Sequence, residues 1–61
     1  MKTIEITFTV DIAVITITTE DSVTIRRVKK TAALVWMHKQ GLKWTWVTLE
    51  DGTEQAIWSR E

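Results

Sequence analysis

The side chains that could act as a nucleophile or as a base are few in this sequence. There is one histidine, His38, there is no cysteine, and the only serines are Ser22 and Ser59. Covalent catalysis needs a nucleophile beside a base, and a third group that orients the base. His38 falls on an expected helix, away from its packed side, so it should be exposed to solvent. We therefore expect no enzymatic activity and no catalytic residue.

The carboxylates form two adjacent pairs, Glu20-Asp21 and Glu50-Asp51, and each pair falls at an expected turn. A helix cap and a hairpin turn account for these pairs better than acid–base chemistry does. A zinc site needs about four ligands, which one histidine without cysteine cannot supply. The only glycines are Gly41 and Gly52, too few for a glycine-rich phosphate loop. The sequence predicts neither a cofactor nor a metal site.

Positive charge is concentrated in the middle of the chain. The candidate phosphate contacts are Arg26, Arg27, Lys29 and Lys30, which would form a basic face if this segment is helical. The formal net charge is nevertheless zero and the pI is near 6.6, which argues against a protein made mainly to bind nucleic acid or an anionic membrane. A nucleic-acid-binding regulator is therefore the alternative function, and charge that keeps a helix surface in water is the simpler explanation.

Sixty-one residues allow one domain, residues 1–61, with a small core. Without cysteine there is no disulfide, so stability must come from large side chains or from a second subunit. Glu5 interrupts the first apolar stretch, and the uncharged run from Ile12 to Ile17 is far too short to span a bilayer. We expect a soluble protein with no membrane partner, cytoplasmic if it is natural. Asparagine, tyrosine and proline are absent, which also fits a designed or selected sequence, or a small phage or plasmid product.

Alternating apolar residues predict a hairpin at the start of the chain. The apolar residues stand at even positions from Ile4 to Val10 and at odd positions from Ala13 to Ile17. A loop with an even number of residues, either Asp11-Ile12 or Thr9 to Ile12, produces this change of parity. The competing interpretation is one continuous strand that is exchanged between two chains.

Helical spacing follows, and we expect a helix from Ser22 to Gln40. Thr19-Glu-Asp-Ser22 offers N-cap residues, and Gly41 stands where a C-cap belongs. The apolar face would contain Ile25, Val28, Ala32, Val35 and Trp36. Val23-Thr-Ile25 is β-branched and begins a helix poorly. This weakness keeps an all-β small barrel open, with strands at Val23 to Val28 and at Leu34 to His38.

Asp51-Gly52, between two apolar runs, predicts a second hairpin. A two-residue turn would scatter the tryptophans over both faces. A three-residue loop, Glu50-Asp51-Gly52, places Trp44 opposite Trp58 and Trp46 opposite Ala56, so that all three tryptophans share one face. We prefer this register, and we expect these rings and Trp36 to form the core and not a ligand platform.

These elements predict an α+β fold of ββαββ type, a four-stranded sheet of order 2-1-4-3 with one helix on one face and the terminal strands parallel. The architecture, the segment Lys43-Trp-Thr-Trp46 and the last hairpin resemble the immunoglobulin-binding domains of protein G, and the helix and chain length resemble protein L. The resemblance implies a shared shape, and no antibody-binding residue carries over from it.

Protein binding is the function that the sequence favours. Strand 13–19 would be an edge strand without charge or proline, open to pairing with a partner or with its own copy. The candidate interaction surface contains Val14, Thr16, Thr18, Leu34, Met37, Val47 and Leu49. We expect a non-catalytic protein-binding or inhibitory module, or a designed or selected scaffold, that could self-associate through residues 13–19.

Overall fold

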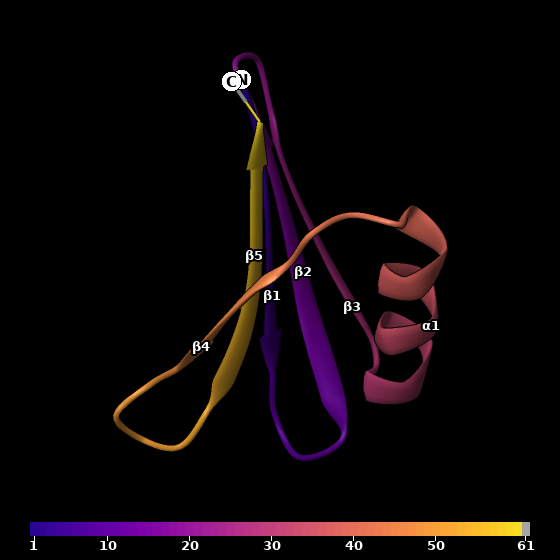
Figure 1. The fold of residues 1–61 in the computed structure, drawn as a ribbon, viewed down its shortest axis with the longest axis vertical. Coiled ribbons are helices and arrows are strands. Elements are labelled where there is room, and N and C mark those ends of the chain that lie inside the picture. The colour runs from indigo at the N-terminus through magenta and orange to yellow at the C-terminus, as the bar shows by residue number, and fades with distance from the viewer. Residues whose placement is uncertain (61) are drawn as a thin grey trace.

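A computed structural model describes residues 1–60 as one five-stranded sheet and one helix (Figure 1). The elements are β1 (Lys2–Phe8), β2 (Ile12–Thr19), β3 (Val23–Lys29), α1 (Lys30–Gln40), β4 (Thr45–Thr48) and β5 (Glu54–Arg60). The strand order is β3-β2-β1-β5-β4, and all neighbouring strands are antiparallel. The α+β class agrees with the prediction, whereas the predicted four-stranded ββαββ sheet lacks one strand.

β1 and β2 form the hairpin that the alternation predicted. Phe8 pairs with Ala13, which is the register of the four-residue loop from Thr9 to Ile12. The Thr9 N–H donates to the Ile12 carbonyl at 2.8 Å, and the Thr9 hydroxyl donates to the same oxygen at 2.8 Å. A threonine side chain thus stabilises a turn that contains no glycine. Because the chain folds back on itself here, the exchanged-strand interpretation is wrong.

Residues Val23–Lys29 form a strand, so the helix predicted from Ser22 to Gln40 is wrong over its first half. β3 pairs with β2 along its whole length. Val23, Thr24 and Ile25 are β-branched, and such side chains lose χ1 freedom in a helix but pack well on a sheet.

Thr19 to Ser22, predicted as a helix cap, is instead the turn between β2 and β3. The Thr19 N–H donates to the Ser22 carbonyl at 2.8 Å, and the two hydroxyl oxygens lie 3.1 Å apart. Residues of the type that cap helices also stabilise tight turns, because their side chains bond to nearby backbone in both settings. This shared chemistry explains the wrong prediction.

α1 ends as the sequence predicted. Gly41 has a φ of 63° and its N–H donates to the His38 carbonyl at 3.3 Å. His38 and Lys39 lie in the last turn, at the negative end of the helix dipole. The alternative of an all-β barrel is right that residues 23–28 form a strand. It is wrong for residues 34–38, which are helical.

The additional strand, β3, reverses the direction of the last strand relative to the first. With two strands before the helix, the first and last strands would be parallel. With three strands before the helix, β1 and β5 remain neighbours but run antiparallel. The relative order of the four predicted strands is preserved. The predicted parallel pairing of the first and last strands, and with it the architecture of the protein G and protein L domains, is wrong.

The last hairpin has the three-residue loop that we preferred. Thr45 pairs with Ile57 and Trp46 with Ala56. The Leu49 N–H donates to the Thr53 carbonyl at 2.7 Å, which closes the loop of residues 50–52. Gly52 has a φ of 88°, a conformation that glycine adopts without a steric penalty.

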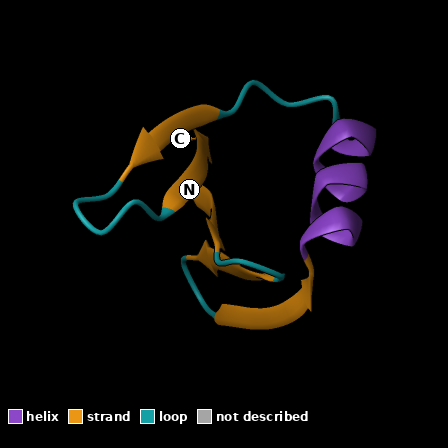
Figure 2. Ribbon diagram, turned by 90° about the horizontal axis from the view of Figure 1, so that it is seen from below, coloured by secondary structure: helices purple, strands orange, loops and turns teal. Residues whose placement is uncertain are grey.

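α1 covers one face of the sheet and leaves the other uncovered. Figure 2 shows the sheet bending round, with α1 standing across the concave side. The helix continues directly from β3 at one edge of the sheet and leads through residues 41–44 to β4 at the other edge. The chain thus crosses the sheet once, on the helix side.

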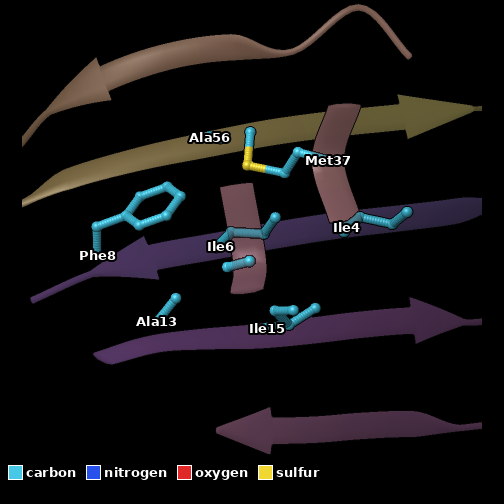
Figure 3. Close-up of a cluster of buried hydrophobic side chains, with 8 residues drawn as sticks. Ile4, Ile6, Phe8, Ala13, Ile15, Met37 and Ala56 are labelled. Atoms are coloured by element: carbon cyan, nitrogen blue, oxygen red, sulfur yellow. The ribbon is translucent and has the colours of Figure 1, made fainter. Parts of the chain in front are cut away.

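The core belongs mainly to the first hairpin. The buried side chains of the core, drawn in Figure 3, are Ile4, Ile6, Phe8, Ala13, Ile15, Ala33, Met37 and Ala56. Trp36, Trp44 and Trp58 are only partly buried and pack against this cluster. Trp46 is 52% exposed.

The prediction of a tryptophan core is therefore right about the face of the sheet and wrong about its centre. β1 is the middle strand of five, so its side chains are covered from both sides. β4 is an outermost strand, and its rings have neighbours on one side only. Position in the sheet, and not residue size, decides which side chains are buried.

Candidate interaction surface

The groups that could have supported catalysis lie on separate elements. His38 is exposed on the last turn of α1, Ser22 is exposed in the β2–β3 turn, and Ser59 is exposed near the end of β5. Within residues 1–60 no three histidine, aspartate or glutamate side chains lie close enough together to hold a metal ion.

The two carboxylate pairs lie in turns of the sheet. The Thr53 N–H donates to Asp51 Oδ1 at 2.9 Å, and this hydrogen bond lowers the pKa of the Asp51 carboxyl below its ordinary value of 3.8. Glu20 Oε1 lies 3.5 Å from the N-terminal ammonium of Met1. The Asp51 carboxyl, whose pKa is lowered, stays ionised at neutral pH and is a poor general acid. Asp51 therefore stabilises the turn of the last hairpin.

The sheet face opposite α1, which we call the open face, is covered by no helix. Side chains on one face alternate along each strand and match across each pair. The open face therefore carries Thr3, Glu5 and Thr7 of β1; Ile12, Val14, Thr16 and Thr18 of β2; Val23, Ile25, Arg27 and Lys29 of β3; Thr45 and Val47 of β4; and Gln55, Ile57 and Ser59 of β5.

Polar groups hold the middle of the open face together. Gln55 Nε2 donates to Glu5 Oε1 at 3.0 Å and to Thr7 Oγ1 at 3.0 Å, and these bonds cross from β5 to β1. The bonds are partly buried, so they stabilise the pairing of the terminal strands. They also divide the apolar residues of the face into two groups.

The two apolar groups lie along opposite edges of the sheet. The β3 patch consists of Ile12, Val14, Val23 and Ile25, and the β4 patch of Val47, Leu49 and Ile57. Ile25 is 65% exposed and Val23 is 61% exposed. Exposed branched side chains that adjoin on a sheet form a surface on which another protein can pack.

The predicted interaction residues separate into two sets. Most of them share the open face or its rim: Val14, Thr16, Thr18, Val47 and Leu49. Leu34 is 42% exposed, but it lies on α1 and so on the other side of the sheet. The prediction for Met37 is wrong, because this side chain is 5% exposed and belongs to the core. The packed side of α1 carries Ala33 and Met37, whereas the spacing continued from Ile25 had assigned Val35 to that side.

The prediction that strand 13–19 is an edge is wrong, so its backbone has no free side on which a second strand could pair. β2 lies between β1 and β3 and pairs with both. The edges are β3, with seven residues, and β4, with four. The sequence prediction failed here because it assigned the true edge strand to the helix.

The backbone of β3 presents a regular set of free groups. In an antiparallel pair, residues that exchange hydrogen bonds alternate with residues that do not. Thr19 bonds to Ser22, and the Lys30 N–H bonds to the Asp11 carbonyl at 2.9 Å. Counting from both ends, Thr24, Arg26 and Val28 bond to β2. Among the described residues, the N–H and C=O groups of Val23, Ile25, Arg27 and Lys29 therefore point away from the sheet.

The basic residues do not form a helix face as predicted. Arg26, Arg27 and Lys29 belong to β3, and Lys30 is the first residue of α1. Alternation places Arg26 on the helix side and Arg27 and Lys29 on the open face. β3 thus carries three cations and no carboxylate along the free edge. Whether these side chains contact phosphate remains a prediction.

A shallow cleft of about 440 Å³ lies on the helix side, between the first and last hairpins and α1. Its walls include Phe8, Leu34 and Trp46. The rings of Phe8 and Trp46 are stacked, with centroids 5.6 Å apart and 22° between their planes. Lys30 and the carboxylates of Asp51 and Glu54 also line it, so it favours neither sign of charge clearly.

Comparison of the chain with family models, with curated proteins and with solved structures finds no match. Within residues 1–60, the helix α1 is neither long enough nor apolar enough to cross a bilayer.

Proposed function

We propose that this protein is a non-catalytic protein-binding module that holds its partner on the open face, at the β3 edge. The observation that carries the proposal is the position of the β3 patch. Exposed Val23 and Ile25 stand beside a row of free backbone groups on the same strand. Side-chain burial and backbone pairing are therefore both available to a partner at one place.

The total exposed surface supports the same function. The protein exposes 4783 Å². A compact monomer of 7.1 kDa exposes about 4,100 Å² by the usual relation between mass and surface. The excess, about 700 Å², is close to the area that one partner contributes to a standard interface. A partner on the open face would bring this exposed surface to the ordinary level.

A library of random peptides, displayed on phage and selected on the immobilised protein, tests the proposal. We expect most selected sequences to lose binding to Ile25→Lys, which places a charge in the β3 patch. They should keep binding to Val35→Lys, the matched control, because Val35 is similarly exposed, at 56%, but lies on α1. Selection of no sequence, or equal loss with both variants, would contradict the proposal.

Nucleic acid is the alternative partner. Phosphate contacts from Arg27 and Lys29 would give binding that falls steeply with salt. If short single-stranded or duplex DNA binds tightly in about 50 mM salt, and the selected peptides do not bind, the partner class proposed here is wrong.

A further inference from the structure

We infer that the partner contributes an extended, acidic segment that pairs with β3 as a sixth strand of the sheet. This inference rests on the proposed function and names the chemistry of the partner. Addition of a strand to a sheet edge draws its affinity from main-chain hydrogen bonds and its specificity from alternate side chains. β3 offers both over seven residues, Val23–Lys29.

The main-chain part follows from the hydrogen-bond alternation. Val23, Ile25, Arg27 and Lys29 direct their N–H and C=O groups outward. The strand contains neither proline nor glycine, so no position lacks a donor or interrupts the row. These groups are bonded to water in the free protein, and an added strand would replace that water.

The charges of β3 decide between a second copy of this chain and a different partner. Cations on an edge strand are a common device against aggregation. Antiparallel pairing of two β3 strands would place Arg26 opposite Arg26 and the other cations opposite apolar residues, with no carboxylate on either strand. Like charges across a strand pair destabilise it, and opposite charges stabilise it. The edge therefore repels its own copy and favours an acidic strand.

The order of residues along β3 also gives the pattern of the partner. On the open face, apolar Val23 and Ile25 occupy one half of the strand, and Arg27 and Lys29 occupy the other. A matching strand has β-branched residues on one half and carboxylates at alternate positions on the other. In antiparallel pairing, the carboxylates belong to the N-terminal half of the partner segment.

Titration of the full-length, 15N-labelled protein with two capped peptides tests the inference. The acidic peptide is TETETVTV, and in the control peptide lysine replaces both glutamates. Amide shifts should change most at Val23, Ile25, Arg27 and Lys29. The acidic peptide should bind about tenfold more tightly than the lysine peptide at low salt, and this difference should shrink as salt screens the charges. Equal binding of the two peptides would overturn the inference.

Two variants make the result specific to the edge. Ile25→Pro removes one outward N–H but no bond to β2, so it should fold and lose binding, whereas Ile25→Thr keeps the N–H and should bind. If Ile25→Pro does not fold, the double variant Arg27→Glu with Lys29→Glu replaces it, and this variant should prefer the lysine peptide. Binding by Ile25→Pro equal to that of Ile25→Thr, or an unchanged preference in the double variant, overturns the inference.

The two proposals can fail separately. If the phage-selected peptides bind the open face but neither designed peptide binds β3, only the acidic-strand inference is wrong. If no peptide of either kind binds the open face, the proposed function is wrong as well.

Discussion

Ile25 pairs with Thr16 across the β2–β3 ladder, with its side chain 65% exposed and its backbone groups directed away from β2. The same residue was expected on the packed side of a helix. Its place on a free edge connects the fold to the proposed function.

The same substitution should have very different effects at the middle and at the edge of the sheet. Ile6 is fully buried on β1, so we expect Ile6→Ala to lower the free energy of unfolding by about 2–5 kcal/mol. Ile25→Ala should change it by less than about 0.5 kcal/mol, as exposed substitutions usually do. Urea denaturation followed by circular dichroism measures both. Similar losses for the two variants would contradict the assignment of β1 to the centre.

The last hairpin should be sensitive to the backbone at Gly52. A side chain there would meet no atom within 4 Å, so only the φ of 88° opposes it. We expect Gly52→Ala to cost about 1–2 kcal/mol, the usual penalty of a left-handed conformation. Gly52→Asn should cost less, because asparagine tolerates positive φ better. Thermal unfolding of the two variants compares them, and a fully stable Gly52→Ala would show that the loop has another conformation.

The Asp51 carboxyl should make the hairpin sensitive to acid. Its hydrogen bond to Thr53 lowers its pKa in the folded protein, so its contribution to stability is present above the unfolded pKa. This contribution is lost as the pH falls from about 4 through the lowered folded value. Asp51→Asn should remove that part of the pH dependence. A side-chain NMR titration gives the pKa directly, and a value at or above 3.8 would contradict the bond.

Much of the fold was predictable, because local patterns decide it. The register of the last hairpin followed from Asp51-Gly52 and from the requirement that the large apolar rings share one face of the sheet. The parity change between Phe8 and Ala13 indicated the first hairpin. Both are contacts between residues close in the sequence, where turn chemistry and alternation are sufficient.

The β3 edge could not be predicted in the same way. Val23-Thr-Ile25 indicated a strand, but Ala32 and Trp36 continued a helical spacing back to Val28, and the boundary at Lys30 lies inside that spacing. Whether Val23–Lys29 is a strand depends on β2 being available to pair with it, and no local pattern contains that information. The error then extended to Met37, to strand 13–19 and to the direction of β5.

The free edge should not make the protein associate with itself. Because β3 carries three cations and β4 is only four residues long, we expect a monomer at high micromolar concentration and low salt. Sedimentation equilibrium measures the mass, and a dimer already present at low salt would contradict the argument from charge. The variant Arg27→Glu, which places opposite charges on one edge, should associate more readily than the wild type.

Amide hydrogen exchange across β3 tests the central claim most directly. If this segment is an edge strand bonded only to β2, protection should alternate along it. Thr24, Arg26 and Val28 should exchange slowly, whereas Val23, Ile25, Arg27 and Lys29 should exchange at rates close to those of an unfolded chain. Uniform protection from residue 26 to residue 40, as in a continuous helix, or protection of Ile25 and Arg27 in the free monomer, would contradict the account.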